Sequence, residues 1–135
     1  MRCSGFALAA VVGLSMLGAP AFADTVPPTP NKCFSMRDME NWKAPDARTI
    51  YIRVNINRFY RLDLAAPCQS LLQPNTHLVT KTRGSDQVCN GIDWDLAVSD
   101  TIGEPGRGFR QACIVKTQTP LTAAEVAAIP KKFKP

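Results

Sequence analysis

The chain has 135 residues, 45% of them hydrophobic, and a formal net charge of +5. This length is sufficient for one domain with a single modest core, which argues against a deep active site. The positive excess is mild and spread along the chain, so it permits an anionic partner without requiring one. We expect no nucleic-acid partner.

The first 23 residues have the pattern of a cleavable secretory signal. Arg2 precedes an apolar run over residues 6–17, and Ala21-Phe22-Ala23 places small residues at the positions that a signal peptidase reads. The run is shorter than the about 18 residues that cross a bilayer. A buried N-terminal helix, the alternative, would leave this cleavage site unexplained. We expect cleavage after Ala23, export to the periplasm and no membrane-spanning segment in the mature chain, whose net charge falls to +4 because Arg2 is lost.

The mature chain begins with a proline-rich leader over residues 24–32, which has no apolar periodicity and should be extended. A single disulfide-stabilised domain follows over residues 33–135. It holds four cysteines, Cys33, Cys68, Cys89 and Cys113. An even number in an exported chain indicates two disulfides, and the wide spacing disfavours a zinc site. Of the three possible pairings we favour Cys68–Cys89 with Cys33–Cys113. The first bond would close a local loop, and the second would join the two ends of the domain.

The clearest local structure is a β-hairpin within residues 50–64, where β-branched and aromatic residues alternate. If the apolar side chains of both strands share one face, Val54 lies opposite Tyr60, and the other pairs follow. This register leaves residues 56–58 as a three-residue loop. Asn57 would then take the left-handed conformation.

The remaining patterns complete a small β-rich domain. We expect a helical turn over 67–72, strands over 77–82, 92–98 and 112–117, and a C-terminal helix over 123–129. Thr122 and Glu125 form a capping box at the start of that helix, and Pro130 ends it. The predicted fold is mainly β: a small antiparallel sheet or partly open barrel of five to six strands, with a short C-terminal helix and two disulfides.

The hairpin register groups four outward-facing side chains as a candidate binding surface: Tyr51, Arg53, Phe59 and Arg61. Arg53 would lie opposite Arg61, an unfavourable pair of like charges. We favour an internal acid as the compensating group, either Asp63 or an acid on a neighbouring strand. The alternative is a bound anion or sugar, held by both guanidinium groups and stacked on the two aromatic rings.

Nothing in the sequence indicates catalysis strongly. His77 is the single histidine and has no nucleophile in a recognisable catalytic setting. Asp93 and Asp95 should lie about 7 Å apart on the exposed side of a strand. We interpret them as solubilising residues in preference to a calcium site or an acid/base pair. The glycines of residues 103–108 match no nucleotide-binding motif and are expected in a loop, so we expect no cofactor and no metal.

The order of these features resembles a known family. Cys33-Phe34 opens the domain, residues 64–68 follow the hairpin, Val88-Cys89 precedes the acidic strand, and residues 112–115 precede the closing helix. This order is similar to that of an uncharacterised family of small exported bacterial proteins with four cysteines, a domain of unknown function, over about residues 33–130. The resemblance implies a periplasmic location and a compact β-rich fold, and it implies no activity, ligand or catalytic residue.

Three hypotheses for function follow. The first is a non-enzymatic periplasmic module that acts through the hairpin face on an anionic glycan, a lipid headgroup or an envelope protein. The second is a small periplasmic hydrolase that uses Asp93, Asp95 or His77. The third is a structural envelope protein held at the membrane surface by its basic end, residues 131–134.

Overall fold

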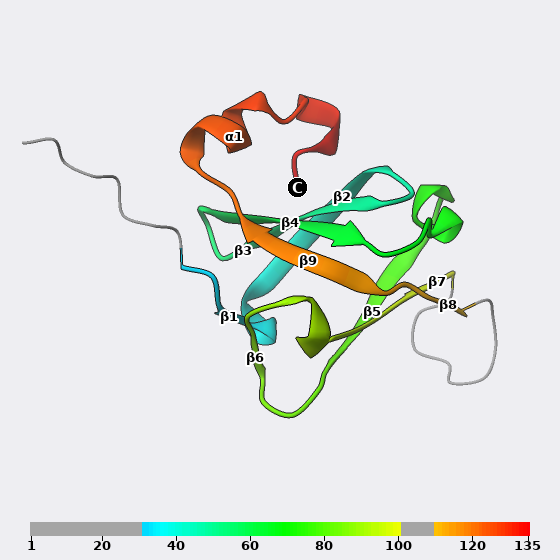
Figure 1. Cartoon of the computed structure of the whole chain (residues 1–135). Coiled ribbons are helices and arrows are strands. Elements are labelled where there is room, and N and C mark those ends of the chain that lie inside the picture. The colour runs from blue at the N-terminus through cyan, green and yellow to red at the C-terminus, as the bar shows by residue number, and fades with distance from the viewer. Residues whose placement is uncertain (1–30, 101–109) are drawn as a thin grey trace, which may run out of the picture.

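The computed structural model of the chain describes residues 31–100 and 110–135, so the expected signal, most of the leader and the loop over 103–108 lie outside the described residues. Nine strands in the described part form three antiparallel sheets (Figure 1). The strands are β1 (Phe34–Ser35), β2 (Met39–Asp46), β3 (Thr49–Val54), β4 (Arg58–Leu64), β5 (His77–Thr82), β6 (Gln87–Val88), β7 (Trp94–Ser99), β8 (Arg110–Ala112) and β9 (Val115–Pro120).

One α-helix, α1 (Ala123–Ala128), and four short 3₁₀ helices complete the described elements. The 3₁₀ helices are η1 (Met36–Asp38), η2 (Gln69–Leu72), η3 (Gly91–Asp93) and η4 (Lys131–Phe133). The prediction of a mainly β fold with a short C-terminal helix and two disulfides is confirmed. The strand count is higher than five to six because β2 was not expected and β1, β6 and β8 are only two or three residues long. In the part of the chain that the structure describes, no helix has the length and apolarity needed to cross a membrane.

The core lies between two sheets. The four-stranded sheet has the order β2-β3-β4-β9, and the three-stranded sheet has the order β5-β7-β8. Alternate residues of β3, β4 and β7 are buried in one apolar cluster, whose members include Ile50, Ile52, Val54, Tyr60, Leu62, Leu64, Trp94, Leu96 and Val98. Full burial of each large aliphatic side chain stabilises the fold by about 1.5–3 kcal/mol. Both sheets therefore contribute apolar side chains to one shared core.

The hairpin of β3 and β4 forms with a register two residues away from the predicted one. Val54 pairs with Arg58 in place of Tyr60, and Ile52 pairs with Tyr60. A shift of two residues keeps every side chain on its predicted face, so the apolar pattern does not distinguish the two registers. The loop is residues 55–57, and Asn55 takes the left-handed conformation with φ of 54°, where Asn57 had been expected.

The predicted strand over 112–117 is in fact two strands in different sheets. β8 pairs with β7, and β9 pairs with β4. Cys113 still donates its N–H to the carbonyl of Leu96, at 2.9 Å, while the carbonyl of Ile114 accepts from the N–H of Ala65 on the other side, also at 2.9 Å. The chain therefore crosses between the two sheets at these two residues.

The two disulfides join Cys33 to Cys89 and Cys68 to Cys113, so the pairing that we favoured from the sequence is wrong. The reason lies in β1 and β6. Phe34 pairs with Val88, which places the residues beyond that pair, Cys33 and Cys89, side by side. Cys68 follows β4, and it is bridged to the point where the chain crosses between the sheets.

A buried glutamine links four segments of the core. Gln118 on β9 is 5% exposed, and its side-chain oxygen accepts from the indole N–H of Trp94 at 2.8 Å. Its amide group donates to the carbonyls of Lys32, at 2.9 Å, and Val88, at 3.3 Å. Every polar atom of this side chain is therefore paired, as a buried amide requires.

The phenol of Tyr60 adds a second link to the segment before Cys33. It donates a hydrogen bond to the carbonyl of Asn31 at 2.8 Å. Burial raises the pKa of Tyr60 above its ordinary value, against the lowering effect of the nearby Arg58 guanidinium. The phenol therefore stays protonated, and this hydrogen bond holds the residues before Cys33 against the core.

Candidate functional site

The outer face of β3 and β4 brings together the four side chains predicted as a binding surface. Tyr51 and Arg53 alternate with buried residues on β3, and Phe59 and Arg61 lie on either side of the buried Tyr60 on β4. In the observed register Tyr51 lies opposite Arg61, and Arg53 lies opposite Phe59. The four residues therefore form a two-by-two block in which each arginine faces an aromatic ring. The predicted pairing of Arg53 with Arg61 is wrong, because it depended on the incorrect register.

Both arginines of this block are paired with acids. The Arg61 Nε and Nη2 atoms each lie 2.8 Å from the Asp63 Oδ1 atom, and Thr117 of β9 donates to Asp63 Oδ2 at 3.1 Å. The Arg53 Nη2 atom lies 3.1 Å from a carboxylate oxygen of Glu40, at the edge of the sheet. Each guanidinium group thus forms an ion pair with an acid of the same chain. These half-exposed pairs contribute at most about 1 kcal/mol each to stability.

The C-terminal segment folds back over this outer face. Figure 1 shows α1 and η4 on one side of the four-stranded sheet, with β5, β7 and β8 on the other side. Ile129, directly after α1, is buried, and so is Pro135. The ammonium group of Lys134 lies 5.9 Å from the centroid of the Phe59 ring. The basic end of the chain is therefore packed against the sheet over the Phe59 side of the block.

The predicted capping box of α1 is confirmed. The Thr122 hydroxyl accepts from the Glu125 N–H at 3.3 Å, and the Glu125 carboxylate accepts from the Thr122 N–H at 2.7 Å. Hydrogen bonds from the backbone and then the side chain of Thr122 lower the pKa of Glu125 below its ordinary value. Glu125 is therefore an anion at neutral pH, and it is held in a fixed position.

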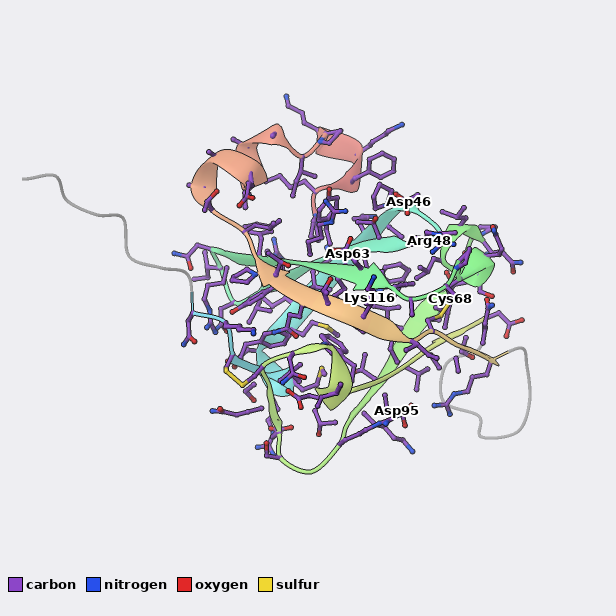
Figure 2. The ribbon with its side chains drawn as sticks, in the orientation of Figure 1. Asp46, Arg48, Asp63, Cys68, Asp95 and Lys116 are labelled. Carbon is purple, nitrogen blue, oxygen red and sulfur yellow. A yellow bond between two sulfur atoms is a disulfide. The ribbon has the colours of Figure 1, made fainter. Side chains whose placement is uncertain are left out.

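A pocket of about 430 Å³ lies between the outer face of the sheet and α1. The sheet contributes Tyr51, Arg61, Asp63 and Thr119, and the C-terminal segment contributes Leu121, Glu125, Ala128 and Ile129. Figure 2 shows Asp63 on β4 beneath the C-terminal segment. The pocket combines apolar side chains with a few polar groups, as small-ligand sites do.

Only two of the four residues of the predicted binding surface line this pocket. Tyr51 and Arg61 line the pocket, whereas Arg53 and Phe59 are not among its lining residues. The contribution of the C-terminal segment was missed. One signal was available: only two residues separate β9 from α1, which begins at Ala123, and so short a connection favours packing of the helix back on the same sheet.

The residues considered for hydrolysis do not come together. Asp93 is not on a strand but at the end of η3, where its Oδ2 atom accepts from the N–H groups of Cys89 and Asn90, at 2.8 and 3.1 Å. Asp95 pairs with Lys81 on β5, and Lys81 lies four residues from His77. Asp95 and His77 are therefore about 13 Å apart along the sheet. In Figure 2 Asp95 is also far from Asp63 and the pocket.

The correction for Asp93 has a physical reason. The apolar alternation begins at Trp94, and Ile92 is 79% exposed, so the predicted strand starts two residues later than expected. Gly91 permits the tight packing of η3 on β9, since a Cβ atom there would lie 2.6 Å from the carbonyl oxygen of Lys116. Across residues 31–100 and 110–135, no three His, Cys, Asp or Glu side chains are grouped as metal ligands.

Comparison with known proteins gives one match. No curated protein and no solved structure shows significant similarity to the chain. The sequence model described as a family of unknown function, DUF6491, matches residues 3–133, which include the strands, all four paired cysteines, and α1. The chain therefore belongs to the family DUF6491.

Proposed function

We propose that this chain is an exported, non-enzymatic binding protein whose site is the pocket between the β3–β4 face and α1. The observation that carries the proposal is the convergence of Tyr51 and Arg61 with a wall supplied by the C-terminal segment. Two of the residues chosen from the sequence thereby line a concave site with fixed polar groups. A ligand bound there would contact both the sheet and the helix.

Export is supported by the cysteines and the N-terminal pattern. All four cysteines after residue 23 form disulfides, and such bonds persist in oxidising compartments. The apolar run and Ala-x-Ala site of the first 23 residues supply the signal that would bring the chain there.

Export predicts a defined N-terminus. Expressed with its own first 23 residues in a Gram-negative host, the protein should appear in the periplasmic fraction and begin at Asp24. Intact mass measurement should give residues 24–135 less four hydrogens for the two disulfides. A variant with Ala23→Arg should remain uncleaved, because the peptidase requires a small residue at that position. Recovery of full-length, reduced protein from the cytoplasm would contradict the proposal.

A non-enzymatic role is supported by the positions of the candidate catalytic residues, which are bonded to other groups or lie far apart. The Asp93 carboxylate is held by two backbone N–H groups, and His77 is remote from Asp95. In the pocket, the Asp63 carboxylate is paired with Arg61 and accepts a hydrogen bond from Thr117. These positions favour a structural or binding role for each side chain over an acid/base role.

A binding function is testable by amide NMR with defined probes. We expect millimolar additions of glucose, glucuronate, inorganic phosphate and glycylglycine to the mature protein to shift amide resonances of the pocket residues for at least one probe. Tyr51→Ala with Arg61→Ala should weaken that binding by tenfold or more, roughly the loss of one good contact. The probe should be recovered unchanged after long incubation.

Arg37→Ala is the matched control, because Arg37 is also paired with an acid, Asp86, and belongs to η1, outside the pocket lining. This variant should bind the probe as the original protein does. Shifts that cluster outside the pocket, or conversion of the probe, would contradict the proposed function.

A further inference from the structure

We infer that the ligand of this pocket is a neutral saccharide and not an anion. This inference rests on the proposed function and specifies its ligand class. Three observations carry it: the charge balance of the lining residues, the polar groups that remain without partners, and the apolar side chains that line the pocket beside them.

The charge of the pocket disfavours an anion. Its lining residues include one basic side chain, Arg61, and two acidic ones, Asp63 and Glu125. Two nitrogen atoms of Arg61 are already bonded to Asp63, so the guanidinium charge is compensated. Glu125 is ionised and has no basic partner among the described residues. A carboxylate or phosphate in this space would therefore meet a net negative surface.

The free polar groups are suited to hydroxyls. Among the residues that the structure describes, the hydroxyls of Tyr51 and Thr119 have no hydrogen-bond partner. Glu125 uses its Oε2 atom for the N–H and hydroxyl of Thr122, which leaves Oε1 unpaired in the same part of the chain. The pocket thus offers two groups that donate or accept and one that only accepts. A sugar hydroxyl, which donates and accepts, satisfies both kinds.

Apolar side chains line both sides of the pocket. Leu121, Ala128 and Ile129 of the C-terminal segment line it together with the Tyr51 ring on the sheet. A pyranose has an apolar face of C–H groups and a polar rim of hydroxyls, so it matches a site that combines apolar side chains with hydroxyls. An alkylammonium ion would satisfy the net charge, but it only donates hydrogen bonds, so the hydroxyl protons of Tyr51 and Thr119 would be left without an acceptor.

The test compares sugars that differ only in charge. Glucose and glucuronate, and galactose and galacturonate, are titrated into the mature protein, with inorganic phosphate and methylammonium as ionic probes. Pocket amide shifts in NMR give each dissociation constant. We expect the neutral member of at least one pair to bind about fivefold or more tightly than its acid, the effect of one contact between like charges. Glu125→Gln should reduce this preference toward unity.

Tyr51→Phe and Tyr51→Ala separate stacking from hydrogen bonding, and melting temperatures verify that the variants fold. Tyr51→Ala should weaken sugar binding more than Tyr51→Phe does. Three results would overturn the inference while leaving the binding function intact: tighter binding of the uronates, of phosphate, or of methylammonium in the pocket. If no neutral sugar shifts the pocket resonances, a saccharide ligand is likewise excluded. The proposed function fails only when no probe from either set binds in the pocket.

Discussion

Replacing Cys68 and Cys113 together by alanine should lower the free energy of unfolding by about 2–5 kcal/mol. The bridge joins residues 45 apart in sequence and links the segment after β4 to the crossing point between the two sheets. A domain of this size has one modest core, so the constraint that the bridge places on the unfolded chain is a large share of total stability. Urea unfolding followed by tryptophan fluorescence measures the loss.

Two further double variants test the pairing itself. In the mature chain, which lacks Cys3, Cys33→Ala with Cys89→Ala should keep the other bridge and show no free thiol. Cys68→Ala with Cys89→Ala takes one sulfur from each bridge, and it should show two free thiols and the largest loss of stability. A Cys68→Ala and Cys89→Ala protein without free thiols, as stable as the other two, would show that the pairing is not Cys33–Cys89 with Cys68–Cys113.

Gln118→Leu should cost about 1–3 kcal/mol although it leaves the shape of the side chain nearly unchanged. The substitution removes all three hydrogen bonds of Gln118 and leaves the Trp94 indole N–H without an acceptor inside the core. Chemical unfolding gives the magnitude. Adding Trp94→Phe to Gln118→Leu removes the stranded donor, so the double variant should lose less than the sum of the single losses. Additive losses of stability would show that Gln118 and Trp94 are not energetically coupled.

Gln118→Glu gives the same network a pH dependence. A carboxyl at this buried site should have a raised pKa, because burial and the facing carbonyls of Lys32 and Val88 disfavour its charged form. The folded state then holds the proton more tightly than the unfolded state. The variant should therefore approach the original stability below about pH 4, near the unfolded pKa, and become less stable as pH rises above it. A loss that does not vary between pH 3 and pH 7 would contradict this account.

Elements with a strong local signal were predicted well from the sequence. The strand over 77–82 is β5, the helical turn after Pro67 contains η2, and the capping box of Thr122 and Glu125 begins α1. Each of these signals comes from a few neighbouring residues. β2 gave no such signal, because it lies at the edge of its sheet, is largely exposed and contains Pro45, which only an edge strand tolerates.

The features that were predicted wrongly depend on contacts between distant residues. The hairpin slip of two residues leaves the apolar pattern unchanged, so turn geometry at Asn55 decides it. The disulfide pairing follows from β1 and β6, two strands of two residues each that no periodicity can reveal. Asp93 was placed on a strand because its alternation with Trp94 looks the same whether the residue begins a strand or ends a turn.

Two of the eight residues that line the candidate site were predicted as binding residues from the sequence. Alternation places Tyr51 and Arg61 outward on adjacent strands in either register, and both line the pocket. Arg53 and Phe59 were included because alternation cannot show which part of an outer face another segment covers. Leu121, Ala128 and Ile129 line the pocket because of where α1 docks on the sheet, and the short connection from β9 favours docking on that sheet without specifying the position.

The order of the bridged residues along the chain has a consequence for proteolysis. The segment from Cys33 to Cys89 overlaps in sequence with the segment from Cys68 to Cys113, and neither disulfide loop is nested within the other. Cleavage of any one peptide bond between residues 33 and 113 leaves two pieces still covalently tied by at least one bridge. A protease that cuts the chain once within this span cannot release a fragment while the disulfides are intact.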